Sequence, residues 1–188
     1  SSWRPLFGQA GIAQRHLDKQ GISEGDLFLF FGWFRQTVAD GGRLVFDRRA
    51  PHVHAIFGYL QVGRKVTVAE GAAEDWMRYH PHLHGARRGS KDNTVYEAAP
   101  SLSWDRSVPG AGVLDYHPNR VLTKAGCSRS VWRLPDFLRQ TTITYHSPKS
   151  WSAAGFQSAC IGQEFVIAPC DGLEAWAHEI IAASSSRE

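Results

Sequence analysis

An unbroken apolar run, LFLFFGWF, fills positions 27 to 34 and constrains the fold more than any other stretch of the chain. It has the length of a buried strand. Gly25 and Asp26 make a turn before it, and Gly41 with Gly42 predicts a hairpin turn into a short strand, RLVF. No run of about 18 apolar residues occurs, so we expect no membrane-spanning segment.

Residues 52–68, HVHAIFGYLQVGRKVTV, predict one long strand or two. Their alternation places His52, His54 and Leu60 on one face of that strand and Tyr59 on the other. Gly58 in mid-strand indicates a bulge or a close approach by another backbone or a ligand.

Helices and strands are interspersed along the chain without regular alternation, which argues against a doubly wound parallel sheet. We expect helices at 8–20, at 72–79 and from Asp171, which can cap an amphipathic C-terminal helix. Further strands are expected at 93–98, at 141–146 and as a pair at 156–168 that bends at Gly162. The predicted fold class is α+β: a mixed, mainly antiparallel curled sheet or a barrel with flanking helices.

The chain has 188 residues, which predicts a single domain over 1–188. A net charge of +3 is compatible with a polyanionic partner without requiring one. Three widely spaced cysteines with no CxxC pair fit a reducing cytoplasm. The first residues do not resemble a signal peptide, and the chain starts without methionine, so an N-terminal segment is expected to be missing.

The segment HPHLHG holds three histidines in six residues. His-x-His spacing, which also occurs at His52 and His54, can chelate zinc or iron. Pro81 interrupts the segment and no carboxylate or cysteine stands at a recognisable spacing, so we expect no metal. Phosphate-binding, dinucleotide and nucleophile-elbow motifs are also missing, and we expect no bound cofactor.

Aromatic and amide side chains suggest a pocket for a base, because a flat ring stacks on a base and an amide matches its edge. Core packing is the competing interpretation for Trp33, and solvent exposure for Glu164. The candidate nucleotide-binding residues are Trp33, Arg35, Tyr59, His80, Asn93, Tyr96, Gln157 and Gln163. The candidate phosphate-binding residues are Arg48, Arg87 and Arg88, and the candidate acid–base residues are His82, His146 and Glu164.

Several segments together resemble the nucleotide modification associated domain 3 family of bacteria and phages. They include GDLFLFFGWFR (25–35), HAIFGYLQVG (54–63), NTVYEA (93–98), VWRLPDF (131–137) and FQSACIGQEFVI (156–167). The resemblance implies a part in making or handling modified nucleotides in DNA. The GDLFLFF and IFGYLQVG stretches are also similar to PUA-like barrels of the ASCH and EVE groups, which bind RNA or modified bases.

Three functions remain open at this stage. The first is a recognition module for a nucleotide or nucleic acid, with DNA favoured as the partner. The second is a transferase or hydrolase that modifies a base by His82, His146 and Glu164 chemistry. The third is a structural or partner-binding domain.

Overall fold

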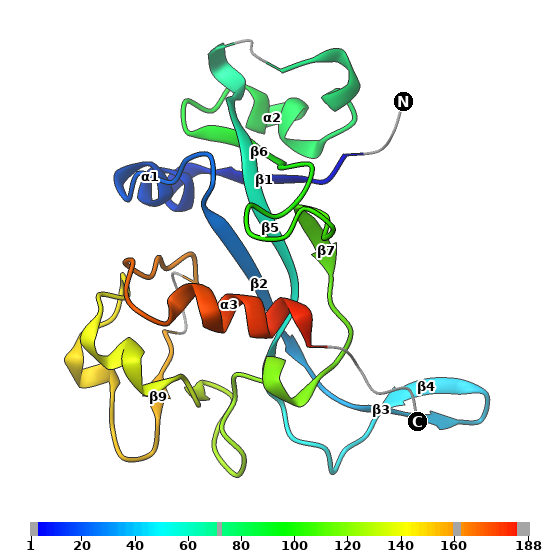
Figure 1. Ribbon diagram of the computed structural model, residues 1–188. Coiled ribbons are helices and arrows are strands. Elements are labelled where there is room, and N and C mark those ends of the chain that lie inside the picture. The colour runs from blue at the N-terminus through cyan, green and yellow to red at the C-terminus, as the bar shows by residue number, and fades with distance from the viewer. Residues whose placement is uncertain (1–3, 71–72, 160–162, 184–188) are drawn as a thin grey trace. The chain divides into compact units, whose positions relative to one another are not determined.

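The computed structural model describes residues 4–70, 73–159 and 163–183. The chain groups into two units, one of Ser1–Leu29 with Gly58–Val113 and one of Phe30–Phe57 with Leu114–Glu188. Strands β2 (Leu27–Phe34) and β5 (Val53–Thr67) each contribute residues to both units. Both strands are labelled in Figure 1. We refer to the two units as unit 1 and unit 2.

The remaining elements divide between the units. Unit 1 holds β1 (Leu6–Ala10), α1 (Gly11–Lys19), α2 (Gly85–Arg88), β6 (Asn93–Ala98) and β7 (Ala111–Val113). Unit 2 holds β3 (Thr37–Asp40), β4 (Arg43–Phe46), β8 (Val131–Trp132), β9 (Phe156–Gln157) and α3 (Leu173–Ala182). Short 3-10 helices span Val68–Glu70, Asp75–Met77, Pro81–Leu83, Pro118–Arg120, Asp136–Gln140 and Pro148–Ser150.

The main sheet is open, with strand order β1-β6-β5-β2 and β7 paired to β5. β6 pairs antiparallel with both β1 and β5, and β7 pairs antiparallel with β5. The mixed, mainly antiparallel α+β prediction is confirmed. The barrel alternative is not realised, because β1 and β2 are the ends of the strand order.

Unit 1 is built around the buried strands β5 and β6. Tyr96 is fully buried, and its ring packs 5.1 Å from that of Phe28 and 6.0 Å from that of Phe7. Gln14 of α1 donates a hydrogen bond to the Tyr96 hydroxyl at 2.9 Å. Burial raises the pKa of Tyr96 to about 12, so the phenol stays neutral and keeps this contact at physiological pH.

Unit 2 is built around an aromatic cluster and a buried arginine. Trp132, 1% exposed, packs edge-on against Phe31 of β2 at 5.0 Å. Arg120 is 3% exposed, and its guanidinium donates to the carbonyls of Ile180, Ile181 and Ala183 at the end of α3. Because the last carbonyls of a helix have no partner within it, Arg120 both caps α3 and fixes it in unit 2.

Several local predictions are confirmed. β2 spans Leu27–Phe34, and the β3–β4 hairpin turns at Gly41 and Gly42, both with positive φ. Residues 93–98 form β6, and the long alternating segment forms one strand, β5. These are segments in which the local pattern and the backbone pairing agree.

Other local predictions are wrong. The helix expected at 8–20 starts at Gly11, because residues 6–10 pair with β6 as β1. The strand expected at 141–146 is reduced to one bridge between Ile143 and Ile167, and Tyr145 turns the chain away with φ 64°. A single 3-10 turn, Asp75–Met77, stands where a helix was expected at 72–79.

The C-terminal helix is confirmed, but its expected cap is not. Gly172, with φ 86°, occupies the N-cap position instead of Asp171. Of the strand pair expected over 156–168, the described residues form β9 and the bridge at Ile167, and the bend at Gly162 lies outside the described residues. Within the part of the chain that the structure describes, no helix is long and apolar enough to cross a membrane.

Replacing Arg120 by alanine should destabilise the protein by about 3 kcal/mol, because the carbonyls at the end of α3 lose the guanidinium that donates to them. Urea denaturation measures the change. Arg133→Ala, at an exposed position of the same unit, is the matched control and should have little effect. Equal stability of the two variants would show that Arg120 does not hold α3.

Candidate functional site

The candidate site residues fall into both units. Unit 1 contains Tyr59, His80, His82, Arg87, Arg88, Asn93 and Tyr96. Unit 2 contains Trp33, Arg35, Arg48, His146, Gln157, Gln163 and Glu164. The geometry of each group is therefore a property of its own unit.

The two candidate tyrosines lie in the core of unit 1. Tyr59 is 6% exposed, and its hydroxyl donates to the carbonyl of Pro109 at 3.0 Å. Burial raises the pKa of Tyr59, as it does that of Tyr96. Neither ring offers a face to a ligand in this structure.

Unit 1 brings His82, Arg87 and Asn93 together. The buried Asn93 amide donates to the carbonyls of His82 and Arg87, both at 2.7 Å, so its side-chain oxygen is left as an acceptor. His82 Nδ1 lies 2.6 Å from that oxygen and therefore carries the proton. Its Nε2 then accepts from Arg87 at 3.0 Å, which requires a neutral ring. Both ring nitrogens of His82 are thus engaged within the protein.

His80 packs closely against β1 because Gly8 has no side chain. A Cβ added at Gly8 would lie 2.5 Å from His80 Cε1 and 2.6 Å from His82 Cδ2. Burial, with a smaller effect of His82, lowers the pKa of His80. The lowered pKa favours a neutral ring at His80, and the close packing on Gly8 fixes both rings.

Unit 2 carries the most accessible of the predicted aromatic residues. Trp33 lies at the end of β2 and is 61% exposed. Its indole N–H donates to His52 Nδ1 at 2.8 Å, and the guanidinium carbon of Arg129 lies 3.8 Å from the ring centroid. The ring is therefore held at its edge and on one face while much of its area faces solvent.

Arg129 was not among the residues predicted from the sequence. Its loop is anchored because Thr123 donates to the Arg129 carbonyl at 2.8 Å and accepts from the backbone N–H of His54 at 2.8 Å. The stacking on Trp33 follows from this anchoring. No motif around Arg129 signals it, because Trp33 lies far away along the sequence.

His54 lies beneath this surface and is uncharged. Trp132 donates its indole N–H to His54 Nδ1 at 3.0 Å, and His54 is 5% exposed. Burial, and secondarily the positive charge of Arg129, lower the pKa of His54. The positive charge near Trp33 is therefore that of Arg129 rather than of His54.

His146 forms its hydrogen bonds with backbone groups away from Trp33. His146 Nδ1 bonds the Thr144 carbonyl at 2.9 Å, and its Nε2 accepts from the Ala159 N–H at 3.0 Å. Gln157 and Gln163 are exposed, Glu164 is partly buried, and Arg48 is exposed in the turn after β4. Arg88 of unit 1 is exposed in α2.

A concave surface lies beside α3 in unit 2. It is a hollow of about 310 Å³ whose lining includes Asn119, Arg133, Trp176 and Glu179. An indole, an amide and charges of both signs could also hold a small heterocycle. As for metals, no group of three or more His, Cys, Asp or Glu in the described ranges is placed to hold an ion.

The family model of nucleotide modification associated domain 3 matches residues 1–168. The chain belongs to this family. The match confirms the resemblance seen in the sequence and associates the chain with nucleotide modification. No curated protein and no solved structure matched significantly.

Gly8→Ala should destabilise the protein by about 1–3 kcal/mol, because the new methyl group overlaps the fixed ring of His82. Gly89→Ala is the matched control, since nothing lies within 4 Å of an added Cβ there and φ is −86°. Urea unfolding of both variants is the measurement. If Gly8→Ala were as stable as Gly89→Ala, the packing of His82 on β1 would be wrong.

The unfolding free energy should decrease as the pH is lowered from about 7.5 to about 5.5. The pKa of His54 lies below its ordinary 6.5 in the folded protein, so the unfolded chain binds more protons in this window. His54→Gln keeps an acceptor for Trp132 but cannot titrate. Its stability should depend less steeply on pH, and an unchanged slope would contradict a neutral His54.

Proposed function

We propose that the chain recognises a nucleotide, free or within a nucleic acid, by stacking the base on Trp33 and binding phosphate through Arg129 and Arg35. Base–aromatic stacking contributes about 1–3 kcal/mol per base, and arginine pairs well with phosphate oxygens. A nucleotide site at Trp33 agrees with the family's association with nucleotide modification.

The observation that carries the proposal is a comparison of the arginine–tryptophan stacks. Arg4 over Trp76 also pairs with Glu97 at 2.8 Å, and Arg139 over Trp151 also pairs with Asp136 at 2.9 Å. Arg129 over Trp33 forms no ion pair among the described residues. Its charge lacks the carboxylate that the other two stacks have, which favours an external anion.

Arg35 supports the same assignment. It follows Trp33 by two positions and is partly buried, and its Nε has no hydrogen-bond partner in the described part of the chain. Arg129 Nε is likewise buried without a hydrogen-bond partner among the described residues. Leaving these two buried Nε–H groups without partners costs free energy, and a phosphate bound at the two side chains would offset part of that cost.

The site is also preorganised. The hydrogen bond to His52 and the cation–π contact with Arg129 fix the indole before any ligand arrives. A ring that is already ordered loses less entropy on stacking than a mobile one. Affinity for a single base is therefore obtained from a small contact area.

Recognition is favoured over acid–base catalysis by the candidate histidines. A general acid or base exchanges a proton with its substrate through a ring nitrogen that the substrate can reach. Both ring nitrogens of His82 and both of His146 are hydrogen-bonded within the protein. We therefore propose positioning roles for these two residues, with His82 orienting Arg87.

Trp33→Ala should weaken binding of deoxynucleoside monophosphates by at least about tenfold, since stacking contributes about 1–3 kcal/mol. Arg129→Ala should weaken it as well, and Arg129→Lys should recover part of the loss because charge is restored without the planar stack. Isothermal titration calorimetry measures both.

Trp76→Ala is the matched control, because it also removes an arginine-stacked indole, in unit 1. It should leave the affinity within about twofold of wild type. Equal losses in Trp33→Ala and Trp76→Ala, or no loss in either, would contradict the proposal.

A further inference from the structure

The β3–β4 hairpin of unit 2 is a two-stranded ribbon with every residue exposed. Leu44 is 77% exposed and Phe46 64%. A two-stranded ribbon is at best marginally stable in water, and full burial of a Leu or Phe side chain contributes about 1.5–3 kcal/mol. The hairpin therefore has the composition of a segment that is covered in a complex.

The register of the hairpin separates two different faces. Thr37 pairs with Phe46 and Ala39 with Leu44, so these four side chains share one face, which we call the Leu44 face. Arg48 follows in the turn after β4. Val38 and Val45 lie on the opposite face with Asp40 and Arg43. The Leu44 face is thus free of charged side chains within the paired strands.

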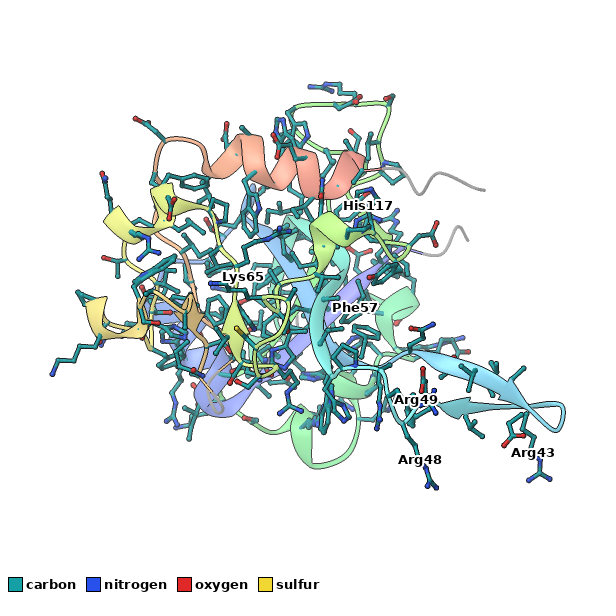
Figure 2. All side chains as sticks on the ribbon, turned by 90° about the horizontal axis from the view of Figure 1, so that it is seen from below. Arg43, Arg48, Arg49, Phe57, Lys65 and His117 are labelled. Atoms are coloured by element: carbon teal, nitrogen blue, oxygen red, sulfur yellow. The ribbon has the colours of Figure 1, made fainter. Side chains whose placement is uncertain are left out.

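The charge of the hairpin indicates an anionic partner. Between positions 35 and 49 the chain has four arginines and two aspartates. Figure 2 shows Arg43 near the turn of the hairpin and Arg48 with Arg49 at its other end. Asp47 accepts from the backbone N–H of Arg49, and none of these three arginines forms an ion pair among the described residues.

The hairpin is continuous with the Trp33 site. Arg35 and Gln36 lead from β2 into β3, and Asp47 donates its N–H to the Gln36 carbonyl at 2.9 Å to close the base of the ribbon. The chain then reaches His52, which accepts from the Trp33 indole. A four-residue strand extends about 13 Å, so a ligand that contacts both Trp33 and the turn end of the hairpin is a polymer rather than a free nucleotide.

We propose that the β3–β4 hairpin is an arm that enters the major groove of double-stranded DNA, so that Trp33 receives a base turned out of that duplex. The inference rests on the function proposed above. Strands of four residues extend about 13 Å, and the groove is about 12 Å wide and 8.5 Å deep, wide enough for a two-stranded ribbon. Duplex RNA has a major groove too narrow for such an arm.

The chemistry of the arm matches that groove. Leu44 and Phe46 contact base edges and thymine methyl groups, which line its floor. Arg43, Arg48 and Arg49 neutralise phosphates at its walls, which makes binding depend on salt. An aromatic ring at the base of the arm then stacks on the extruded base, whose unpairing costs a few kcal/mol.

The test uses the full chain and three variants. Leu44→Thr with Phe46→Thr removes the apolar groups of the Leu44 face, and Arg43→Ala with Arg48→Ala removes charge. Val38→Thr with Val45→Thr is the matched control on the opposite face. Fluorescence anisotropy measures binding of a duplex DNA of about 20 base pairs over a range of salt concentrations, and calorimetry measures binding of mononucleotides.

The Leu44/Phe46 variant should lose at least about tenfold in duplex affinity and stay within about twofold of wild type for mononucleotides. The arginine variant should reduce the slope of log K against log salt by about 2. The control should bind the duplex within about threefold of wild type.

Different failures have different meanings. Unchanged duplex affinity in the Leu44/Phe46 variant, or binding of duplex RNA as tight as that of duplex DNA, would contradict the proposal that the hairpin enters the DNA major groove. So would a wild-type dimer in sedimentation that this variant dissociates, since the hairpin would then be covered by a second copy. Arm-dependent duplex binding without any effect of Trp33→Ala would instead retain the arm and overturn the base site.

Discussion

Burial of the long strand β5 is the constraint on which the rest of the structure depends. A buried strand must pair its backbone polar groups, and β5 does so with successive segments. In unit 1 its partners are β6, β7 and Asp26, which accepts from the Val62 N–H at 2.8 Å. In unit 2 Leu122 donates to the His54 carbonyl at 2.9 Å. Each partner segment is held in place by a hydrogen bond to a backbone group of β5, and without that bond the group would be buried unpaired.

Side chains of β5 extend the same principle to the loops. Gln61 is 4% exposed, and its amide bonds the Gly25 carbonyl, the Ser103 hydroxyl and the Ser103 N–H. His54 Nδ1 accepts a hydrogen bond from the Trp132 indole. The backbone N–H of His54 donates to Thr123, whose hydroxyl in turn donates to the Arg129 carbonyl. Burial of the start of β5 therefore positions Arg129 on one face of the Trp33 ring, and the rest of that ring is exposed.

Local patterns predicted β2, β6 and the β3–β4 turn because in these segments apolar periodicity and glycine placement act on the backbone directly. They did not predict β1, whose residues extend only because β6 lies beside them. At the site, the sequence identified Trp33 but could not separate it from Tyr59 and Tyr96, since burial depends on which face a partner strand covers. Arg129 depends on a contact distant in sequence, which no local pattern encodes.

The central claim is that a base stacks on Trp33. The chain has seven tryptophans, each with one indole N–H signal in a ¹H–¹⁵N spectrum, and Trp33→Phe assigns the signal of Trp33. Addition of a deoxynucleoside monophosphate should shift the Trp33 signal saturably and leave the buried Trp132 signal in place. A shift of the Trp176 signal with an unchanged Trp33 signal would place the ligand in the hollow beside α3 and contradict the claim.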